Sequence, residues 1–181
     1  MLKWQRPSIV HRKCKAWSEL GEEIIKAEGE ADYYWETEVA NNEDQYEFVT
    51  YQDKPIPKPQ KPQGTLKTYT YSRNKRVACN ALQHANYQCE INSNHVTFIR
   101  KSNGTPYVEP HHLVPMAFQD DFDVSLDREQ NIVTLCSNCH RKIHYGLDKE
   151  KVLRTLYKER KSALEDIGIE ITVEELIQMY Q

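Results

Sequence analysis

Hydrophobic positions along the chain follow helical spacing in some stretches and the alternation typical of strands in others. Between residues 72 and 86, apolar residues recur at helical intervals, which predicts an amphipathic helix. The face of this helix that is expected to point inward carries Val77, Ala81, Leu82 and Ala85. Residues 17–27 show a weaker form of the same spacing.

Short runs rich in β-branched and aromatic residues predict strands. Residues 96–100 and 107–112 flank the turn-forming sequence at residues 102–104, so we expect these two runs to form a hairpin. Residues 46–51 and Ile132–Leu135 have the same character and are the other predicted strands.

After these strands the chain has the pattern of three helices. The first is expected to begin near Ser137, a residue type that favours helix N-caps, and to end at Gly146. The second covers Lys149–Asp166, and Gly168 follows it as a helix breaker. The third begins with the capping-box spacing of residues 172–175. The apolar residues of the second helix that are expected to face the core are Val152, Leu153, Leu156 and Leu164.

Composition and length fit one compact domain with an appendage. The chain has 181 residues, of which 28% are charged, and its mean hydropathy is −0.79. Residues 53–64 contain four prolines alternating with lysine and glutamine, which is typical of a semi-rigid linker. We therefore divide the chain into an accessory segment (residues 1–53), a linker (54–64) and a second domain (65–181).

Charge is distributed unevenly over these parts. The accessory segment holds 6 Lys and Arg against 12 Asp and Glu, whereas residues 64–181 hold 15 of each kind. With its aromatic residues Trp17, Tyr33, Tyr34 and Trp35, the acidic accessory segment is interpreted as a docking surface for a protein partner. A solvated acidic arm is the alternative interpretation.

The sequence indicates a cytoplasmic protein without membrane association. Its apolar runs are far too short to cross a bilayer, and the residues after Met1 do not form the apolar centre of a signal peptide. The cysteine count is five, and two of the cysteines are three positions apart. This pattern favours reduced thiolates that hold a metal over a disulfide framework.

Cys136 and Cys139 have the spacing with which a tight turn directs two sulfurs at one zinc ion. A closed tetrahedral site needs two further ligands, and Cys89 with His95 is the best pair available. Buried thiols without metal and an exposed loop histidine are the alternatives. Cys79 is expected to pack within its helix, and Cys14 has no assignment.

Histidines predict a second metal site. His111 and His112 are adjacent on a predicted strand, so their side chains are expected to point to opposite faces. His140 and His144 are four residues apart on a predicted helix and therefore share one face. One strand histidine can meet this pair at a shared ion, while the other stays free to act on a water molecule.

As a set, these motifs resemble the HNH endonucleases, and among them the restriction-type, McrA-like members. The resemblance covers about residues 71–146 and rests on CEINSNH, YVEPHHLVPM, the NIV at Asn131 and LCSNCHRKIHYG, with a similar C-terminal helical tail. It implies an α+β fold with a ββα-metal core, a structural zinc knuckle, flanking helices and a small N-terminal accessory segment. Asn92 departs from the commoner pattern, which has a second cysteine there, and His95 would substitute for it.

The resemblance also implies roles for individual residues. His112 would be the general base that activates water, and Asn131 would brace the loop between the strands and orient this base. His111 and His140 would bind the catalytic divalent metal, with His144 as third ligand or phosphate contact. A neutral imidazole suits proton transfer near neutral pH, which agrees with the role of His112.

Glu109 would support the metal ligands, and Arg141 would contact a phosphate. Because the second domain is neutral overall, DNA affinity must come from local basic residues. Besides Arg141, these are expected to be Arg73, Lys75, Arg76, Arg100, Lys101 and Lys142.

The function expected from the resemblance is metal-dependent hydrolysis of phosphodiester bonds in DNA, most simply double-stranded DNA, in restriction or anti-phage defence. The structural ion would be Zn²⁺, and the catalytic ion Mg²⁺, Mn²⁺, Ni²⁺ or Zn²⁺. The alternative is a non-catalytic zinc-ribbon subunit that binds DNA or protein. Homodimer formation, sequence or modification specificity and an activating partner are left open.

Overall fold

The computed structural model describes residues 35–36, 38–39, 47–60 and 71–181. The helix predicted for residues 17–27, and Cys14, lie outside these residues. None of the helices in the described part of the chain has the length and apolar character needed to span a bilayer.

The centre of the fold is a two-stranded antiparallel sheet. Strand β1 (Glu109–His112) pairs with β2 (Ile132–Leu135), and His111 lies opposite Val133 in the register. All residues of both strands are buried, as expected for strands covered on both faces. The bounds predicted for β2 are confirmed, and β1 is a shortened form of the run predicted for residues 107–112.

The long connection from β1 to β2 contains two short 3-10 helices. They are η2 (Met116–Asp121) and η3 (Glu129–Asn131). Gln119, within η2, is fully buried, and its side chain accepts from the Leu126 N–H and donates to the Val124 carbonyl, both at 2.8 Å. These bonds satisfy backbone groups that a sheet would otherwise pair.

Two strand predictions are wrong. Residues 96–100 form only an isolated antiparallel bridge, between Ile99 and Pro106, and the proline has no N–H with which to extend a ladder. Val96, Phe98 and Ile99 are consequently exposed, so the apolar pattern there does not mark a buried face. Residues 47–51 form no strand either, and the Val49 backbone pairs instead with the side-chain amide of Asn80.

Helix α3 (Lys75–His84) is shorter than its predicted range of residues 72–86, because Asn74 caps it by accepting from the Arg76 N–H at 3.0 Å. Helix α4 (Ser137–Tyr145) is capped at Cys136 rather than at Ser137. The hydroxyl of Ser137 instead donates to a carboxylate oxygen of Glu109.

The C-terminal helices agree with the sequence prediction. Helix α5 (Lys149–Asp166) has the predicted bounds, and its four predicted inward residues are the ones that are buried. Gly168 follows it with φ +82°, a left-handed conformation that favours glycine. Helix α6 (Val173–Gln178) begins with the predicted capping box between Thr172 and Glu175.

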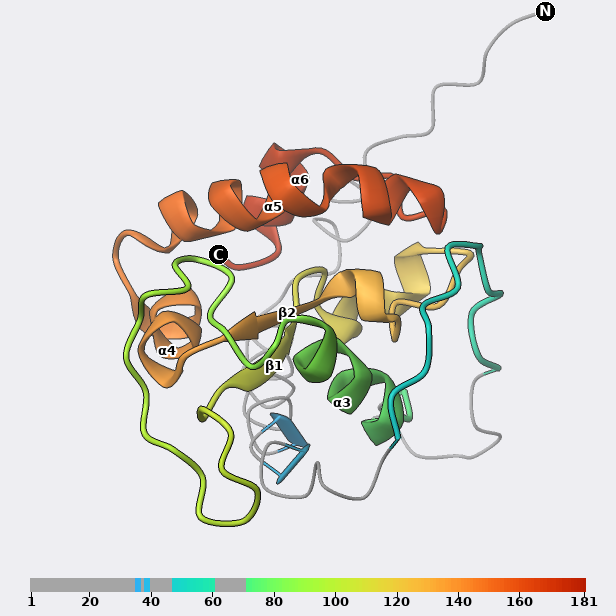
Figure 1. Cartoon of the computed structure of the whole chain (residues 1–181). Coiled ribbons are helices and arrows are strands. Elements are labelled where there is room, and N and C mark those ends of the chain that lie inside the picture. The colour runs from blue at the N-terminus through green and yellow to red at the C-terminus, as the bar shows by residue number, and fades with distance from the viewer. Residues whose placement is uncertain (1–34, 37, 40–46, 61–70) are drawn as a thin grey trace, which may run out of the picture.

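The sheet lies between helices. Figure 1 shows α5 and α6 on one side of the strands and α3 on the other, with α4 leading directly out of β2. The main hydrophobic core joins residues of the sheet, α4, α5 and α6, and a smaller cluster joins α3 to Ile132 and Val39. The site described below lies where β1 meets α4.

Part of the proline-rich segment contacts the second domain. The Ser125 N–H donates to the Ile56 carbonyl at 2.8 Å, and the Arg128 guanidinium donates to the Lys54 carbonyl at 2.8 Å. Residues 54–56 therefore lie along the loop between β1 and β2. The division of the chain at residues 53 and 64 stays a prediction.

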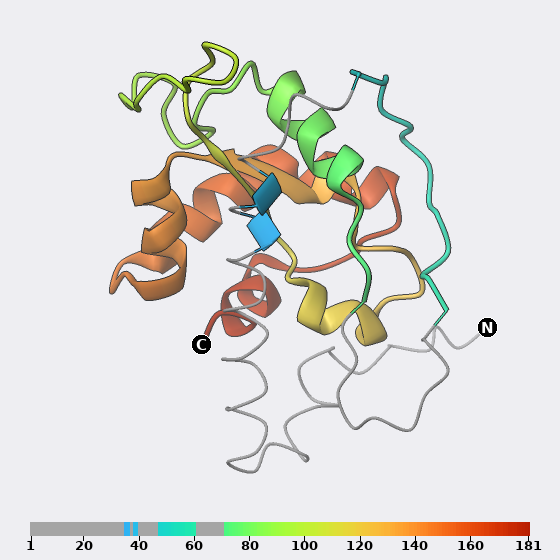
Figure 2. The same ribbon diagram turned by 90° about the horizontal axis from the view of Figure 1, so that it is seen from below.

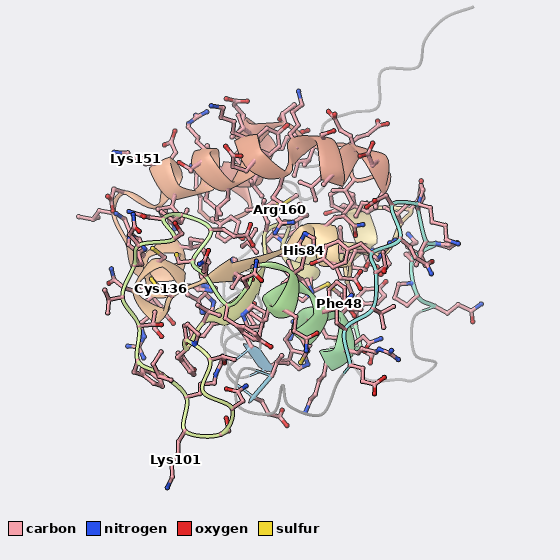
Figure 3. All side chains as sticks on the ribbon, viewed as in Figure 1. Phe48, His84, Lys101, Cys136, Lys151 and Arg160 are labelled. Atoms are coloured by element: carbon pink, nitrogen blue, oxygen red, sulfur yellow. The ribbon has the colours of Figure 1, made fainter. Side chains whose placement is uncertain are left out.

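An ion pair ties α5 to the sheet. Arg160 donates to both carboxylate oxygens of Glu90, at 3.0 and 2.7 Å, and to the Ile132 carbonyl at 3.2 Å. Glu90 in turn accepts from the Thr134 N–H at 2.7 Å. Figure 3 shows Arg160 pointing from α5 toward the strands.

We expect Arg160→Ala to lower the free energy of unfolding by about 2 kcal/mol, because the Glu90 carboxylate then loses charged hydrogen bonds in a partly buried place. Arg154→Ala is the control, since the ion pairs of Arg154, with Glu150 and with Glu174, are solvent-exposed. It should cost less than about 1 kcal/mol. Denaturant unfolding measures both, and equal losses would contradict the prediction.

Candidate metal centre and active site

Three cysteines and one histidine meet at the start of α4. His95 Nδ1 lies 3.6 Å from Cys136 Sγ and 3.4 Å from Cys139 Sγ. With Cys89, the ligand atoms of all four residues lie within 4.8 Å of one another. The sequence predicted this set for the structural zinc, and the structure brings it together. Figure 3 shows Cys136 at the beginning of α4.

The donor set fits zinc. Burial, together with the neighbouring thiols, raises the pKa of Cys139 and of Cys136 above the usual thiol value. A divalent cation supplies the positive charge that thiolates at these positions need. Three sulfurs and one imidazole are a donor set that tetrahedral zinc accepts.

The second cluster joins β1 to α4. The imidazole of His111 lies 5.0 Å, between ring centroids, from those of His140 and His144. His140 Nε2 and His144 Nε2 are 3.1 Å apart because one helical turn separates these residues. Glu36 adds a carboxylate, and the ligand atoms of the four residues lie within 4.8 Å of one another.

Glu109 orients His140. His140 Nδ1 donates to Glu109 Oε2 at 2.6 Å, and Ser137 Oγ donates to the other carboxylate oxygen at 3.0 Å. This leaves His140 Nε2 directed at the centre of the cluster, 2.8 Å from Glu36 Oε2. A carboxylate behind a ligating imidazole fixes its tautomer and strengthens it as a ligand.

Tyr180 orients His111 in a similar way. Its buried hydroxyl has one proton, which it donates to the Leu113 carbonyl at 2.8 Å. It therefore accepts from His111 Nε2, also at 2.8 Å. His111 Nδ1 is left with its lone pair facing the cluster, buried and without a hydrogen-bond partner.

The ionisable groups around the cluster favour a bound positive charge. Burial opposes the charged form of His140, but Glu36 and Glu109 raise its pKa to about 10. Burial and the other two imidazoles lower the pKa of His144 to about 3, so this ring stays neutral. Buried carboxylates around neutral imidazole lone pairs demand positive charge, which a proton or a divalent ion can supply. The residues therefore fit a divalent metal.

His112 lies beside this cluster with a different partner. Its Nε2 is 3.2 Å from Asp127 Oδ1, and its ring centroid is 5.7 Å from that of Trp35. Adjacent strand residues project to opposite faces, so His111 turns toward α4 while His112 does not. The Asp127 carboxylate is held by the Asn74 N–H at 2.6 Å.

Asn131 braces the connection between the strands. Its Oδ1 accepts from the Val114 N–H at 2.8 Å, and its Nδ2 donates to the carbonyls of Val114 and Leu126, both at 2.9 Å. The side chain is fully buried. It thereby holds the chain beside Asp127, the partner of His112.

The sequence profile of the HNH endonuclease family matches residues 79–146, which contain both clusters except for Glu36. This stretch, a little over a third of the chain, is similar to the HNH endonuclease family. Strands β1 and β2 with helix α4 form the ββα core of its HNH domain, in an α+β fold.

The chain is also similar to part of two restriction enzymes. The chain is 32% identical over 87 residues to the type IV methyl-directed restriction enzyme EcoKMcrA of Escherichia coli K12, covering 48% of this chain and 29% of that protein. A solved structure, that of the type IV phosphorothioation-dependent restriction endonuclease ScoMcrA, is similar with a TM-score of 0.43 and 25% identity. That match covers 56% of this chain and 19% of the other. The chain thus spans less than a third of either relative.

The basic residues predicted to contact DNA lie in different environments around the HNH domain. Arg141 and Arg76 are exposed, and Lys101 projects from the tip of the loop before β1 (Figure 3). Lys142 pairs with Asp148, and the Arg73 guanidinium lies 5.6 Å from the Trp35 ring centroid.

Arg100 differs from the other residues that were predicted to contact DNA. It is buried, and its guanidinium donates to Thr105 Oγ1 and to the carbonyls of Pro106 and Val108. These bonds close the loop before β1, so this side chain has a structural role instead of the predicted contact with phosphate.

Three site residues were missed by sequence reasoning. Asp127 and Tyr180 lie outside every motif, in a loop and at the C-terminal end of the chain. Glu36 belongs to the accessory segment, where nothing distinguishes it from the other acidic residues. Only their contacts with His112, His111 and His140 reveal them.

Cys139→Ser should remove the tightly bound zinc and lower the melting temperature by about 10 °C or more, because structural metal binding contributes directly to folding free energy. Metal analysis after dialysis against a mild chelator, followed by thermal unfolding, measures both effects. Cys79→Ala is the control, since Cys79 is buried away from the cluster. Loss of zinc in the control, or retention in Cys139→Ser, would contradict the prediction.

Tyr180→Phe should weaken metal binding at the histidine cluster on the order of tenfold, because the tautomer of His111 is no longer fixed. Titration of the zinc-loaded protein with Co²⁺, followed by visible absorption, measures the affinity. Tyr157→Phe loses a hydroxyl bonded to the Ile171 carbonyl at 2.7 Å, away from the site, and should bind Co²⁺ like the wild type. Equal affinities in all three proteins would show that Tyr180 does not position His111.

Proposed function

We propose that this protein is a metal-dependent endonuclease that hydrolyses phosphodiester bonds in double-stranded DNA. The observation that supports this most strongly is the pair His111 and His112 on β1. One histidine faces the metal cluster, and the other faces a carboxylate partner outside it. A metal-assisted hydrolase needs a cation and a base side by side, and adjacent strand residues provide this arrangement.

The proposed base is His112. Its Nε2 pairs with Asp127, which fixes the ring and stabilises the imidazolium formed when a proton is taken from water. Asn131 keeps the Asp127 loop in place through its three hydrogen bonds. With Nε2 engaged, Nδ1 is the nitrogen that can accept the proton.

The proposed ligands of the catalytic cation are His111, His140 and His144. Such an ion, when bound, stabilises negative charge on the phosphate and on the leaving oxygen. Tyr180 and Glu109 hold two of the three rings with their lone pairs directed inward. The protein thus orients its ligands before substrate arrives, which lowers the cost of binding the transition state.

DNA is proposed as the substrate because the two relatives are restriction enzymes by name. The exposed residues Arg76, Lys101 and Arg141 would contact phosphates, since the domain has no overall positive charge to attract DNA. We also propose that the protein acts in restriction or anti-phage defence. The acidic accessory segment would dock a protein partner.

His112→Ala should reduce cleavage of plasmid DNA by about 10²- to 10⁴-fold, the usual contribution of a general base. Metal content and melting temperature should stay near those of the wild type, because His112 is not in the metal cluster. His84→Ala is the control, since His84 lies on α3 and stacks on Tyr51 away from the site. The substrates should include unmodified and methylated DNA. Undiminished cutting by folded His112→Ala would refute this mechanism.

A further inference from the structure

The described part of the accessory segment lies on the HNH domain. Residues 35–36 and 38–39 are helical, and Figure 2 shows them against the strands, on the same side as α3. Val39 is 1% exposed and packs with Ala78, Ala81 and Ile132. Glu38 forms an ion pair with Lys75 at 2.6 Å. An apolar contact and an ion pair thus hold this segment over the site.

Within this segment, Glu36 enters the metal cluster. Its side chain is 1% exposed, with Oε2 2.8 Å from His140 Nε2 and Oε1 3.4 Å from His111 Nδ1. Moving a carboxylate out of water is costly unless a cation or strong donors compensate. His111 Nδ1 offers no proton, because its ring donates to Tyr180 from the other nitrogen. The carboxylate and the three imidazoles place their ligand atoms in one cluster, which is the geometry needed to bind a cation together.

With Glu36, the cluster has one donor atom more than an open catalytic site. Three imidazoles leave one position of a tetrahedral ion open, and catalytic sites of this type keep that position for water or substrate. Glu36 supplies a fourth donor atom within the same 4.8 Å cluster. Four protein donors are typical of a closed, structural site. A phosphate oxygen and the Glu36 carboxylate would then compete for one position.

Trp35 covers the other half of the active site. Its ring lies 5.7 Å from the ring of His112, and the guanidinium of Arg73 lies 5.6 Å from the Trp35 ring centroid. His112 is only 3% exposed. Trp35 and Glu36, which we call the capping pair, therefore lie against both the proposed base and the proposed metal ligands.

We propose that Glu36 is a fourth ligand of the catalytic cation, supplied by the accessory segment, and that it occupies the position the scissile phosphate requires. The capping pair then has to leave before DNA is cut. This inference rests on the proposed function for its biological meaning, but the ligand assignment itself concerns only metal and phosphate binding.

The first test measures metal binding in the full-length, zinc-loaded protein. Glu36→Gln keeps the shape of the side chain but removes its charge, and should weaken Co²⁺ binding by about tenfold or more. Glu38→Gln is the matched control, because it removes a carboxylate on the same segment that pairs with Lys75 outside the cluster. It should bind Co²⁺ like the wild type. An unchanged affinity in folded Glu36→Gln would show that Glu36 is not a ligand.

The second test uses inorganic phosphate as the competing ligand on protein saturated with Co²⁺. Glu36→Gln should bind phosphate about tenfold more tightly than the wild type, since no carboxylate has to be displaced first. Glu38→Gln should match the wild type. Equal phosphate affinity in wild type and Glu36→Gln would show that Glu36 and phosphate do not compete for one position on the cation.

Cleavage at saturating metal gives a third readout. Glu36→Gln should cut plasmid DNA faster than the wild type, by about tenfold if the capped state predominates. Slower cutting by Glu36→Gln would mean that the reaction requires this ligand, which also overturns the competition. If no variant cuts any DNA, the proposed function fails, while the Co²⁺ and phosphate measurements still decide the assignment of Glu36.

Discussion

Burial of ionisable side chains around one short strand is the constraint on which the rest of this structure depends. Glu36, Glu109, His111, His112 and His140 are all at most 4% exposed. Each of them would cost several kcal/mol if it were left charged and unpaired, or polar and unbonded, in such a place. The surrounding fold is therefore organised to give each group a partner and to leave one position for a cation.

Two strands of four residues cannot provide these partners alone, so other elements supply them. Helix α4 brings Ser137 to Glu109, and the chain after α6 brings Tyr180 to His111. The connection between the strands brings Asp127 to His112 and is itself held by Asn131. The C-terminal helices thus do more than cover the sheet, because Tyr180, which follows α6, also sets which nitrogen of His111 faces the cluster.

The two metal clusters share α4 but differ in what they can do. The Cys₃His cluster fixes the start of α4, and the histidines follow one and two turns later along the same helix. A rigid helix start places His140 and His144 accurately against β1, which is what a preorganised ligand set requires. All four residues of the first cluster come from the HNH domain and form a donor set that zinc accepts, whereas one residue of the second cluster, Glu36, comes from the accessory segment.

The sequence alone determined the features that depend on local spacing. Helical periodicity predicted α5 and its buried face, and the capping box predicted the start of α6. The intervals between cysteines and histidines predicted two clusters, while the choice of His111 over His112 came from the family resemblance. Tertiary structure decided what depends on contacts between distant segments. Residues 96–100 formed a loop with a single bridge to Pro106, and closure of this loop buried Arg100. Glu36, Asp127 and Tyr180 reach the histidines only after folding, because no spacing along the chain relates them to the motifs they complete.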